Sequence, residues 1–173
     1  SDILIALLAV GAVLAGCTQR TETTASEKDR QVRTVTPQEI RQHISRRRKP
    51  IAMVHVWATW CRPCVEKFPE IVSLAELPEM SKVEVVLLSA DDPEKKGAVK
   101  SFLSRHESPW DSMIAESLGE DTIDVLSSEW SGAIPATFFY GPEGTLLEWW
   151  TEPQSSEQYA STIRGLLDRT GTE

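Results

Sequence analysis

The sequence predicts an α/β fold built from a βαβ unit followed by a ββα unit. Residues 51–57 and 83–89 are continuous apolar runs of strand length, which is typical of strands buried in a parallel sheet. Residues 65–77, between these runs, have the pattern of a helix, and a crossover of this kind is right-handed. Further on, residues 136–140 and 145–151 predict an antiparallel hairpin, because a turn containing glycine and proline separates them.

The remaining helices are predicted from their N-terminal signals. The stretch 36–39, Thr-Pro-Gln-Glu, combines a capping box with proline at the first helical position and predicts a helix that runs to about residue 48. Ser155 and Gln158 have the spacing of a second capping box, which predicts a helix after the hairpin. Asp92 and Asp121 are the predicted caps of helices over 94–105 and 121–128.

Composition and charge limit the classes of function. A chain of 173 residues that is 40% hydrophobic and 25% charged fits a single domain with a sizeable core and a short appendage. The formal net charge of -8 argues against nucleic acid as a partner, since phosphate recognition requires a basic face. The basic run at 46–49 lies at a predicted helix end, where cations complement the helix dipole, so we expect it to be solvated.

The first residues have the features of an export and attachment segment. The apolar run at 3–15 is too short to span a bilayer comfortably, and it ends in Leu14-Ala15-Gly16-Cys17. This ending resembles the lipobox of bacterial lipoproteins, which implies a signal peptide over 1–16 and a lipid on Cys17 that attaches the protein to a membrane. Thr18 replaces the aspartate that retains such proteins in the inner membrane, which favours the outer membrane. The alternative is a transmembrane anchor with an incidental cysteine.

Residues 17–35 predict a flexible, lipid-anchored tether, because they are rich in Thr, Glu, Ser, Gln and Arg and almost free of apolar residues. The folded domain is then expected over 36–173. Export would place this domain on the periplasmic side of a bacterial membrane, in an oxidising compartment. A dithiol there acts either as an oxidant or as a reductant that a partner must reduce again.

Cys61 and Cys64, with Arg62 and Pro63 between them, have the spacing of a redox-active pair. Cys61 is expected where strand gives way to helix, and the free amide groups of a helix start lower a thiol pKa from about 8.5 to roughly 3.5–7.5. Arg62 adds a cation, and Pro63 stiffens the helix start without wasting a hydrogen-bond donor. Cys61 is therefore the predicted nucleophile and Cys64 the resolving thiol.

Two segments resemble the TlpA/ResA group of membrane-anchored thiol-disulfide oxidoreductases. One runs from Val54 to Cys64 and is followed by Phe68-Pro69, and the other is Gly132-Ala133-Ile134-Pro135-Ala136-Thr137-Phe138-Phe139. The resemblance covers about 36–168 and implies the thioredoxin fold, a three-layer α/β/α arrangement around a mixed sheet. It also implies a cis peptide bond before Pro135, with Ile134 and Pro135 docking an extended substrate.

The resemblance further implies a reaction and its partners. The expected substrates are disulfide- or thiol-containing exported proteins, with cytochrome c maturation as one setting, and the expected direction is reduction. A membrane electron donor would recycle the pair, and no cofactor beyond the Cys61–Cys64 disulfide is expected. The acidic composition and the absence of an added dimerisation segment predict a monomer.

His55 departs from the pattern of related proteins. The corresponding strand position carries a buried aspartate in thioredoxins and often asparagine in the TlpA/ResA group. A histidine there could relay the proton of Cys64, because its unperturbed pKa is about 6.5, or it could be an ordinary core residue. Trp57 and Trp60 are expected to flank the site and to offer flat surface to a docking peptide.

Other chemistries are weaker alternatives. A Cys-x-x-Cys pair is half of a zinc site, but there is no second pair and the three histidines are scattered. A copper-handling thioredoxin-fold lipoprotein without thiol turnover is the strongest rival, although such proteins have three residues between the cysteines. A peroxidase is disfavoured, because peroxiredoxins act through an isolated cysteine.

Overall fold

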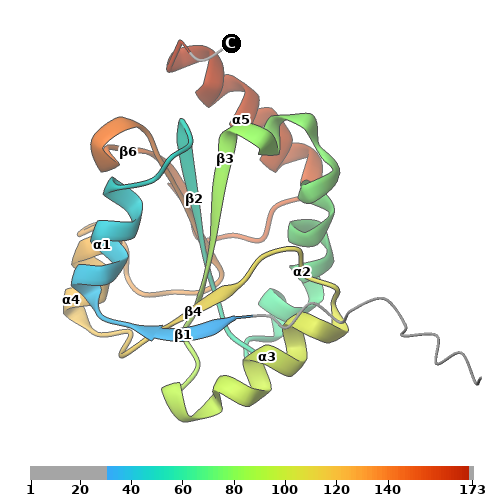
Figure 1. Ribbon diagram of the computed structural model, residues 1–173, viewed down its shortest axis with the longest axis vertical. Helices are drawn as coiled ribbons and strands as arrows, with labels where there is room; N and C mark the ends of the chain where they lie inside the picture. Colours follow the sequence, from blue (N-terminus) through green and yellow to red (C-terminus); the bar gives the residue numbers. More distant parts are fainter. Residues whose placement is uncertain (1–30, 172–173) are drawn as a thin grey trace, which may run out of the picture.

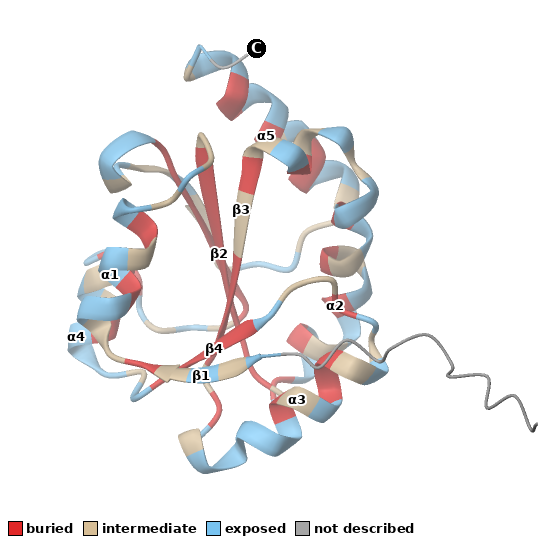
Figure 2. Cartoon of the chain, in the orientation of Figure 1, coloured by how far each residue is buried: buried red, intermediate tan, exposed pale blue. Residues whose placement is uncertain are grey.

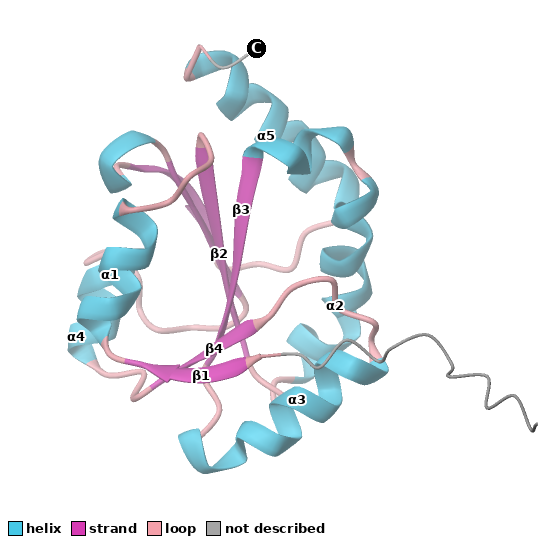
Figure 3. Cartoon of the chain, in the orientation of Figure 1, coloured by secondary structure: helices cyan, strands magenta, loops and turns pink. Residues whose placement is uncertain are grey.

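A six-stranded mixed sheet forms the middle layer of the computed structural model, which describes residues 31–171 (Figures 1 and 3). The sheet order is β1-β4-β3-β2-β5-β6. The first four strands in this order are parallel to their neighbours, whereas β5 is antiparallel to both β2 and β6. The strands are β1 (Val32–Val35), β2 (Ile51–Trp57), β3 (Val83–Ser89), β4 (Ser112–Ala115), β5 (Ala136–Tyr140) and β6 (Leu146–Trp150).

Helices cover both faces of the sheet, which gives three layers (Figure 1). Side chains of α1 (Pro37–Ser45) and α4 (Glu120–Leu126) pack in the hydrophobic core on one face. Side chains of α2 (Arg62–Ser73), α3 (Lys96–Arg105) and α5 (Ser156–Arg169) pack in the core on the other. Both capping boxes predicted from the sequence are present, at Thr36 and Ser155.

β2 lies at the centre of the sheet, and all seven of its residues are buried (Figure 2). Its even-numbered apolar residues face the core under α1 and α4, whereas Ile51, Met53 and Trp57 face the core under α2, α3 and α5. Because side chains alternate along a strand, His55 belongs to the second set. β2 therefore directs His55 toward the layer that contains the cysteine pair.

The boundary predicted at residue 36 for the folded domain is too late, because Val32–Val35 forms strand β1 rather than part of a tether. β1 pairs in parallel with β4 over four residue pairs, and Val35 is buried in the core. β4 was also not predicted. Both strands are only four residues long, which is too short for a periodic pattern to be recognised, and β1 has two polar residues between its valines.

Several predicted ends also differ by a few residues. α2 begins at Arg62 instead of residue 65 and ends at Ser73, where 3₁₀ turns take over. α1 ends at Ser45 rather than near residue 48. In the hairpin, the adjacent tryptophans of β6 lie on opposite faces, and each is half-buried: Trp149 stacks on Phe138, and Trp150 packs against Tyr159.

Candidate active site

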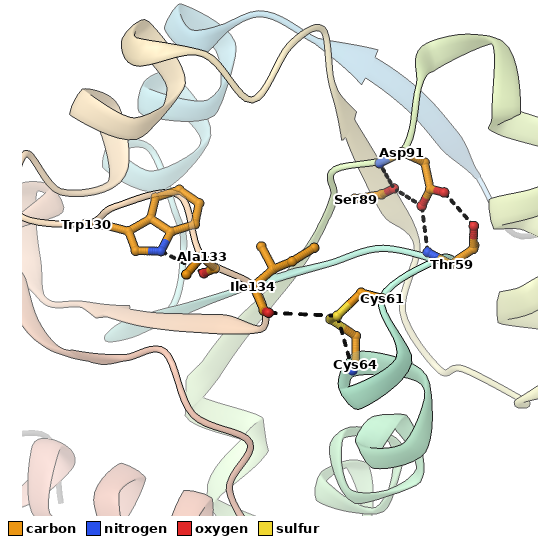
Figure 4. Close-up of a disulfide and its surroundings, with 8 residues drawn as sticks. All are labelled: Thr59, Cys61, Cys64, Ser89, Asp91, Trp130, Ala133 and Ile134. Atoms are coloured by element: carbon orange, nitrogen blue, oxygen red, sulfur yellow. Dashed lines mark hydrogen bonds between the residues drawn. A yellow bond between two sulfur atoms is a disulfide. The ribbon is translucent and has the colours of Figure 1, made fainter.

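Cys61 and Cys64 lie at the start of α2, directly after β2, and are joined by a disulfide (Figure 4). Cys61 is the N-cap residue, and the backbone N–H of Cys64 donates to its Sγ at 3.3 Å. In the reduced protein, this N–H and the helix dipole favour a thiolate at Cys61. Cys61 is 5% exposed and Cys64 is 1% exposed, so Cys61 is the sulfur that a substrate reaches first.

The loop that precedes β5 lies against the disulfide. The peptide bond between Ile134 and Pro135 is cis, and the Ile134 carbonyl oxygen is 3.9 Å from Cys61 Sγ (Figure 4). Pro135 is buried, whereas Ile134 is only half-buried. Two sequence motifs that are 73 positions apart therefore meet at the end of α2.

Trp130 holds this loop from behind. Its ring is buried against Phe138, with the ring centroids 5.3 Å apart. Its indole N–H donates to the Ala133 carbonyl oxygen at 2.9 Å (Figure 4). Gly132 has a φ of 84°, a conformation that side-chain-bearing residues rarely adopt, and this lets the chain turn between Trp130 and Ala133. The carbonyl that faces Cys61 is thus positioned by buried contacts of the preceding residues.

A second anchor fixes the segment between β2 and α2. Asp91, just after β3, is buried, and its carboxylate accepts hydrogen bonds from the Thr59 backbone N–H at 2.9 Å and the Thr59 hydroxyl at 2.5 Å. The Ser89 hydroxyl donates to the same carboxylate at 2.7 Å (Figure 4). Because Thr59 is two residues before Cys61, this network determines where α2 begins relative to the sheet.

The two predicted flanking tryptophans have different environments. Trp60 is 66% exposed and is the exposed large hydrophobic residue of the described chain. Trp57 is wholly buried and packs against Phe68 and Phe102, with centroids 4.9 and 4.8 Å away. The prediction that Trp57 offers surface to a peptide is therefore wrong. A buried position at the end of the central strand made it a core residue, and Trp60 alone presents an open ring.

The charged side chains near the pair are largely turned to solvent. Arg62 is 88% exposed, and its Nε is 2.7 Å from a carboxylate oxygen of Glu66, one turn later. The arginine charge is thus paired with Glu66 rather than held against a sulfur. Pro63 lies in the first turn of α2, where its missing N–H leaves no bond unmade. The helix start itself therefore supplies the main positive field at Cys61.

His55 lies below the pair and is 4% exposed. Its Nδ1 is 2.9 Å from the Thr137 hydroxyl oxygen, which is in turn 2.9 Å from the Tyr159 hydroxyl. Burial lowers the pKa of His55 from 6.5 to about 4, so the imidazole is neutral near pH 7. A small cavity next to the disulfide is lined by both His55 and Cys64. This arrangement places a neutral imidazole near the resolving cysteine.

The other two histidines are not simply on the surface, as the sequence indicated. His43 is half-buried, and its Nε2 is 3.0 Å from a carboxylate oxygen of Glu84. His106 packs on Phe102 with the ring centroids 4.2 Å apart. Within residues 31–171, no three or more His, Cys, Asp or Glu side chains are grouped so that they could hold a metal ion.

The expectations for the start of the chain cannot be placed in this architecture. Cys17, the signal peptide over 1–16 and most of the tether over 17–35 lie outside the described residues. Among the helices of residues 31–171, none has the length and apolar character needed to cross a bilayer.

Sequence reasoning missed several residues that shape the site. Asp91 lies next to the end of a predicted strand, but nothing in the sequence pairs it with Thr59. Trp130 and Thr137 lie near the second motif, and their contacts depend on how that loop and hairpin fold. Tyr159 was assigned to the apolar face of its helix, and its hydroxyl gave no separate signal. Only the hairpin register, which places Thr137 opposite His55, could have indicated one of these contacts.

Curated relatives are thiol-disulfide proteins. The chain is 30% identical to the thiol:disulfide interchange protein DsbE homolog of Paracoccus denitrificans, over 71% of this chain and 63% of the relative. It is 29% identical to the thiol-disulfide oxidoreductase ResA of Bacillus cereus, over 61% of this chain and 57% of the relative. The match thus spans about three fifths of each relative, and ResA agrees with the resemblance found in the sequence.

Solved structures and a family model place the fold. A thioredoxin-related protein from Neisseria meningitidis matches with a TM-score of 0.60 at 17% identity, over 71% of this chain and 89% of that one. StoA from Bacillus subtilis matches with a TM-score of 0.54 at 16% identity, over 67% of this chain and 84% of that one. The predicted thioredoxin fold is thus confirmed. The AhpC/TSA family model matches residues 24–148, well over half of the sequence. The chain therefore belongs to the AhpC/TSA family.

Proposed function

We propose that this protein is a thiol-disulfide oxidoreductase whose Cys61–Cys64 pair exchanges electrons with cysteines of exported proteins. The observation that carries the proposal is the placement of the pair: a disulfide at a helix N-terminus, with Cys61 Sγ 3.9 Å from the Ile134 carbonyl oxygen. The activity of the named relatives supports the same chemistry.

The reaction begins with reduced protein. The Cys61 thiolate attacks one sulfur of a substrate disulfide, and the second substrate sulfur leaves as a thiolate that takes up a proton. Cys64 then loses its proton and attacks Cys61 Sγ, which closes the Cys61–Cys64 disulfide and releases the first substrate sulfur. Two electrons pass to the substrate, and the same steps in reverse oxidise a dithiol.

Substrate docking falls to the surface around Cys61. An extended peptide segment that lies along the loop at Ile134 and Pro135 brings its disulfide to the accessible sulfur, and backbone groups of the loop pair with it. The open ring of Trp60 provides an apolar contact beside it. His55 accepts the Cys64 proton before the second step and returns it when the reaction runs backwards.

The setting follows from the sequence features of the first residues. A lipid on Cys17 and the residues after it would hold the domain on the periplasmic side of a bacterial membrane, with the outer membrane favoured. There the protein acts as a reductant, with cytochrome c maturation as a candidate pathway and a membrane electron donor that reduces the pair again. The domain works as a monomer, and the disulfide is its only redox group.

Turnover of a protein disulfide by the full chain in detergent tests the proposal. Wild type supplied with a chemical reductant is expected to reduce the substrate catalytically, and Cys61→Ser is expected to be inactive. Cys64→Ser should stop at the mixed disulfide and accumulate as a covalent complex with the substrate. Tight stoichiometric copper binding without any thiol turnover would contradict the proposal and favour the copper-handling alternative.

A further inference from the structure

Three buried side chains from three elements form a hydrogen-bonded chain that starts at His55. His55 Nδ1 and Thr137 Oγ1 are 2.9 Å apart, and Thr137 Oγ1 is 2.9 Å from the Tyr159 hydroxyl oxygen. His55 and Thr137 are direct partners in the antiparallel register of β2 and β5, whereas Tyr159 comes from α5. All three side chains are buried, so water does not compete effectively for these bonds.

This chain borders the small cavity that Cys64 also lines. The titratable groups that face His55 there are Cys64 and Lys67 from α2 and Tyr159 from α5. Among the described residues that line the cavity there is no carboxylate. The partners of His55 in the adjacent strands are the uncharged Leu87 and Thr137.

An imidazolium at His55 has no counterion in this environment. Burial already lowers the pKa of His55 to about 4, and the positive Lys67 on the cavity wall works in the same direction. A relay that stores the Cys64 proton on His55 as a cation therefore opposes the electrostatics of the site near pH 7. A proton can enter the imidazole at low cost only if another leaves it.

We infer that Thr137 and Tyr159 are positioning residues that let His55 exchange a proton with Cys64 while its ring stays neutral. Each of the three polar groups in the chain can both donate and accept a hydrogen bond. The bonds can therefore point from His55 to Tyr159, which leaves Nε2 as an acceptor, or from Tyr159 to His55, which leaves Nε2 carrying the proton. The inference rests on the proposed function, because it concerns the step in which Cys64 resolves the mixed disulfide.

The proton balance of this step is closed. The Cys64 thiol proton moves to Nε2 of His55, and the Nδ1 proton of the same ring moves to Thr137 Oγ1. The original Thr137 hydroxyl proton moves to the Tyr159 oxygen, and the Tyr159 proton passes to water at the cavity. One proton enters the chain and one leaves it, no electrons move within it, and Cys64 becomes the attacking thiolate.

Reaction of the reduced full chain with a chromogenic aromatic disulfide tests the inference. The first equivalent of coloured thiol reports attack by Cys61, and the second reports attack by Cys64 on the mixed disulfide. Thr137→Val breaks the chain at nearly constant volume and is expected to slow the second phase by about 10- to 100-fold at pH 7, with the first phase unchanged. Thr137→Ser keeps the hydroxyl and is expected to restore the second phase to within about twofold of wild type.

Tyr159→Phe and solvent deuterium provide a readout that a purely structural role would not move. If several protons move together in wild type, the rate of the second phase depends on the deuterium fraction along a curved line. In Tyr159→Phe the chain ends at Thr137, so we expect a slower second phase and a straight line. A straight line in wild type would overturn the inference.

Each remaining outcome separates the chain from the proposed function. A second phase that is equally fast in Thr137→Val and wild type would overturn the inference and leave the dithiol chemistry intact. Equal slowing in Thr137→Val and Thr137→Ser would also overturn it, since packing rather than the hydroxyl would then be responsible. If wild type released no second equivalent, the proposed function itself would fail.

Discussion

Asp91 and His55 are two buried polar side chains near the disulfide that solve the problem of burial in opposite ways. The Asp91 carboxylate receives three hydrogen bonds, two from Thr59 and one from Ser89. His55 has a hydrogen bond to Thr137 and remains neutral near pH 7, because burial lowers its pKa to about 4. A buried charge is stable when its lone pairs are satisfied, whereas a group with few partners loses its charge. Asp91 therefore anchors the loop, and His55 is available for proton exchange.

Replacing Asp91 with Asn is expected to lower the free energy of unfolding by about 1–3 kcal/mol, because an amide group cannot accept from all three donors and leaves buried groups unpaired. Urea unfolding of the reduced full chain measures the loss. Asp124→Asn, at an exposed position on α4, is the matched control and should change stability by less than about 0.5 kcal/mol. Equal stability of Asp91→Asn and wild type would show that the network does not anchor the loop.

His55 should make stability depend on pH. Its pKa is about 4 in the folded state and about 6.5 when unfolded, so the unfolded chain binds more protons between these values. The free energy of unfolding is then highest above about pH 6.5 and falls by about 3 kcal/mol as the pH drops through about 4. Urea unfolding at a series of pH values measures this slope.

His55→Asn is expected to flatten the pH dependence in that window. His106→Asn is the control, because His106 is less buried and packs on Phe102, and this variant should retain the slope due to His55. Parallel curves for wild type and His55→Asn would contradict the account.

At the scale of elements, the sequence predicted best what has a long, uniform pattern. β2 and β3 are seven-residue apolar strands, α1 and α5 begin with capping boxes, and the hairpin of β5 and β6 is marked by its turn. β1 and β4 were missed because neither has the length to show a period. They pair with one another rather than with the predicted strands at full length, so no local signal required them.

Truncation tests the role of β1. A chain that begins at residue 31 keeps β1, whereas a chain that begins at residue 36 lacks it, including the buried Val35. The shorter chain is expected to lose at least about 1.5–3 kcal/mol of unfolding free energy, the value of one buried valine, and to expose the β4 edge to association. Unfolding curves and light scattering of the two truncated chains would measure both effects. Identical behaviour would place the domain boundary at residue 36 after all.

At the scale of the whole molecule, the site exists because the sheet and two loops bring distant residues together. The end of β2 supplies Cys61, the end of β3 supplies Asp91, and the loop before β5 supplies Ile134 (Figure 4). The sequence predicted Cys61 and Ile134 as parts of one site only through resemblance to a family, because spacing alone does not place a loop. The contacts of Asp91, Thr137 and Tyr159 depend on packing between elements and could not be predicted.

The reduction potential of the Cys61–Cys64 couple tests the central claim most directly. The full chain is equilibrated with dithiol–disulfide buffers of graded potential, and the thiols are counted by alkylation and mass spectrometry, with Cys61→Ser as the control. The account predicts one reversible two-electron transition at a potential near those of reducing thioredoxins, about -270 mV. A transition near about -120 mV, typical of a strong oxidant, would contradict the reductant role, and the absence of any reversible transition would contradict the account as a whole.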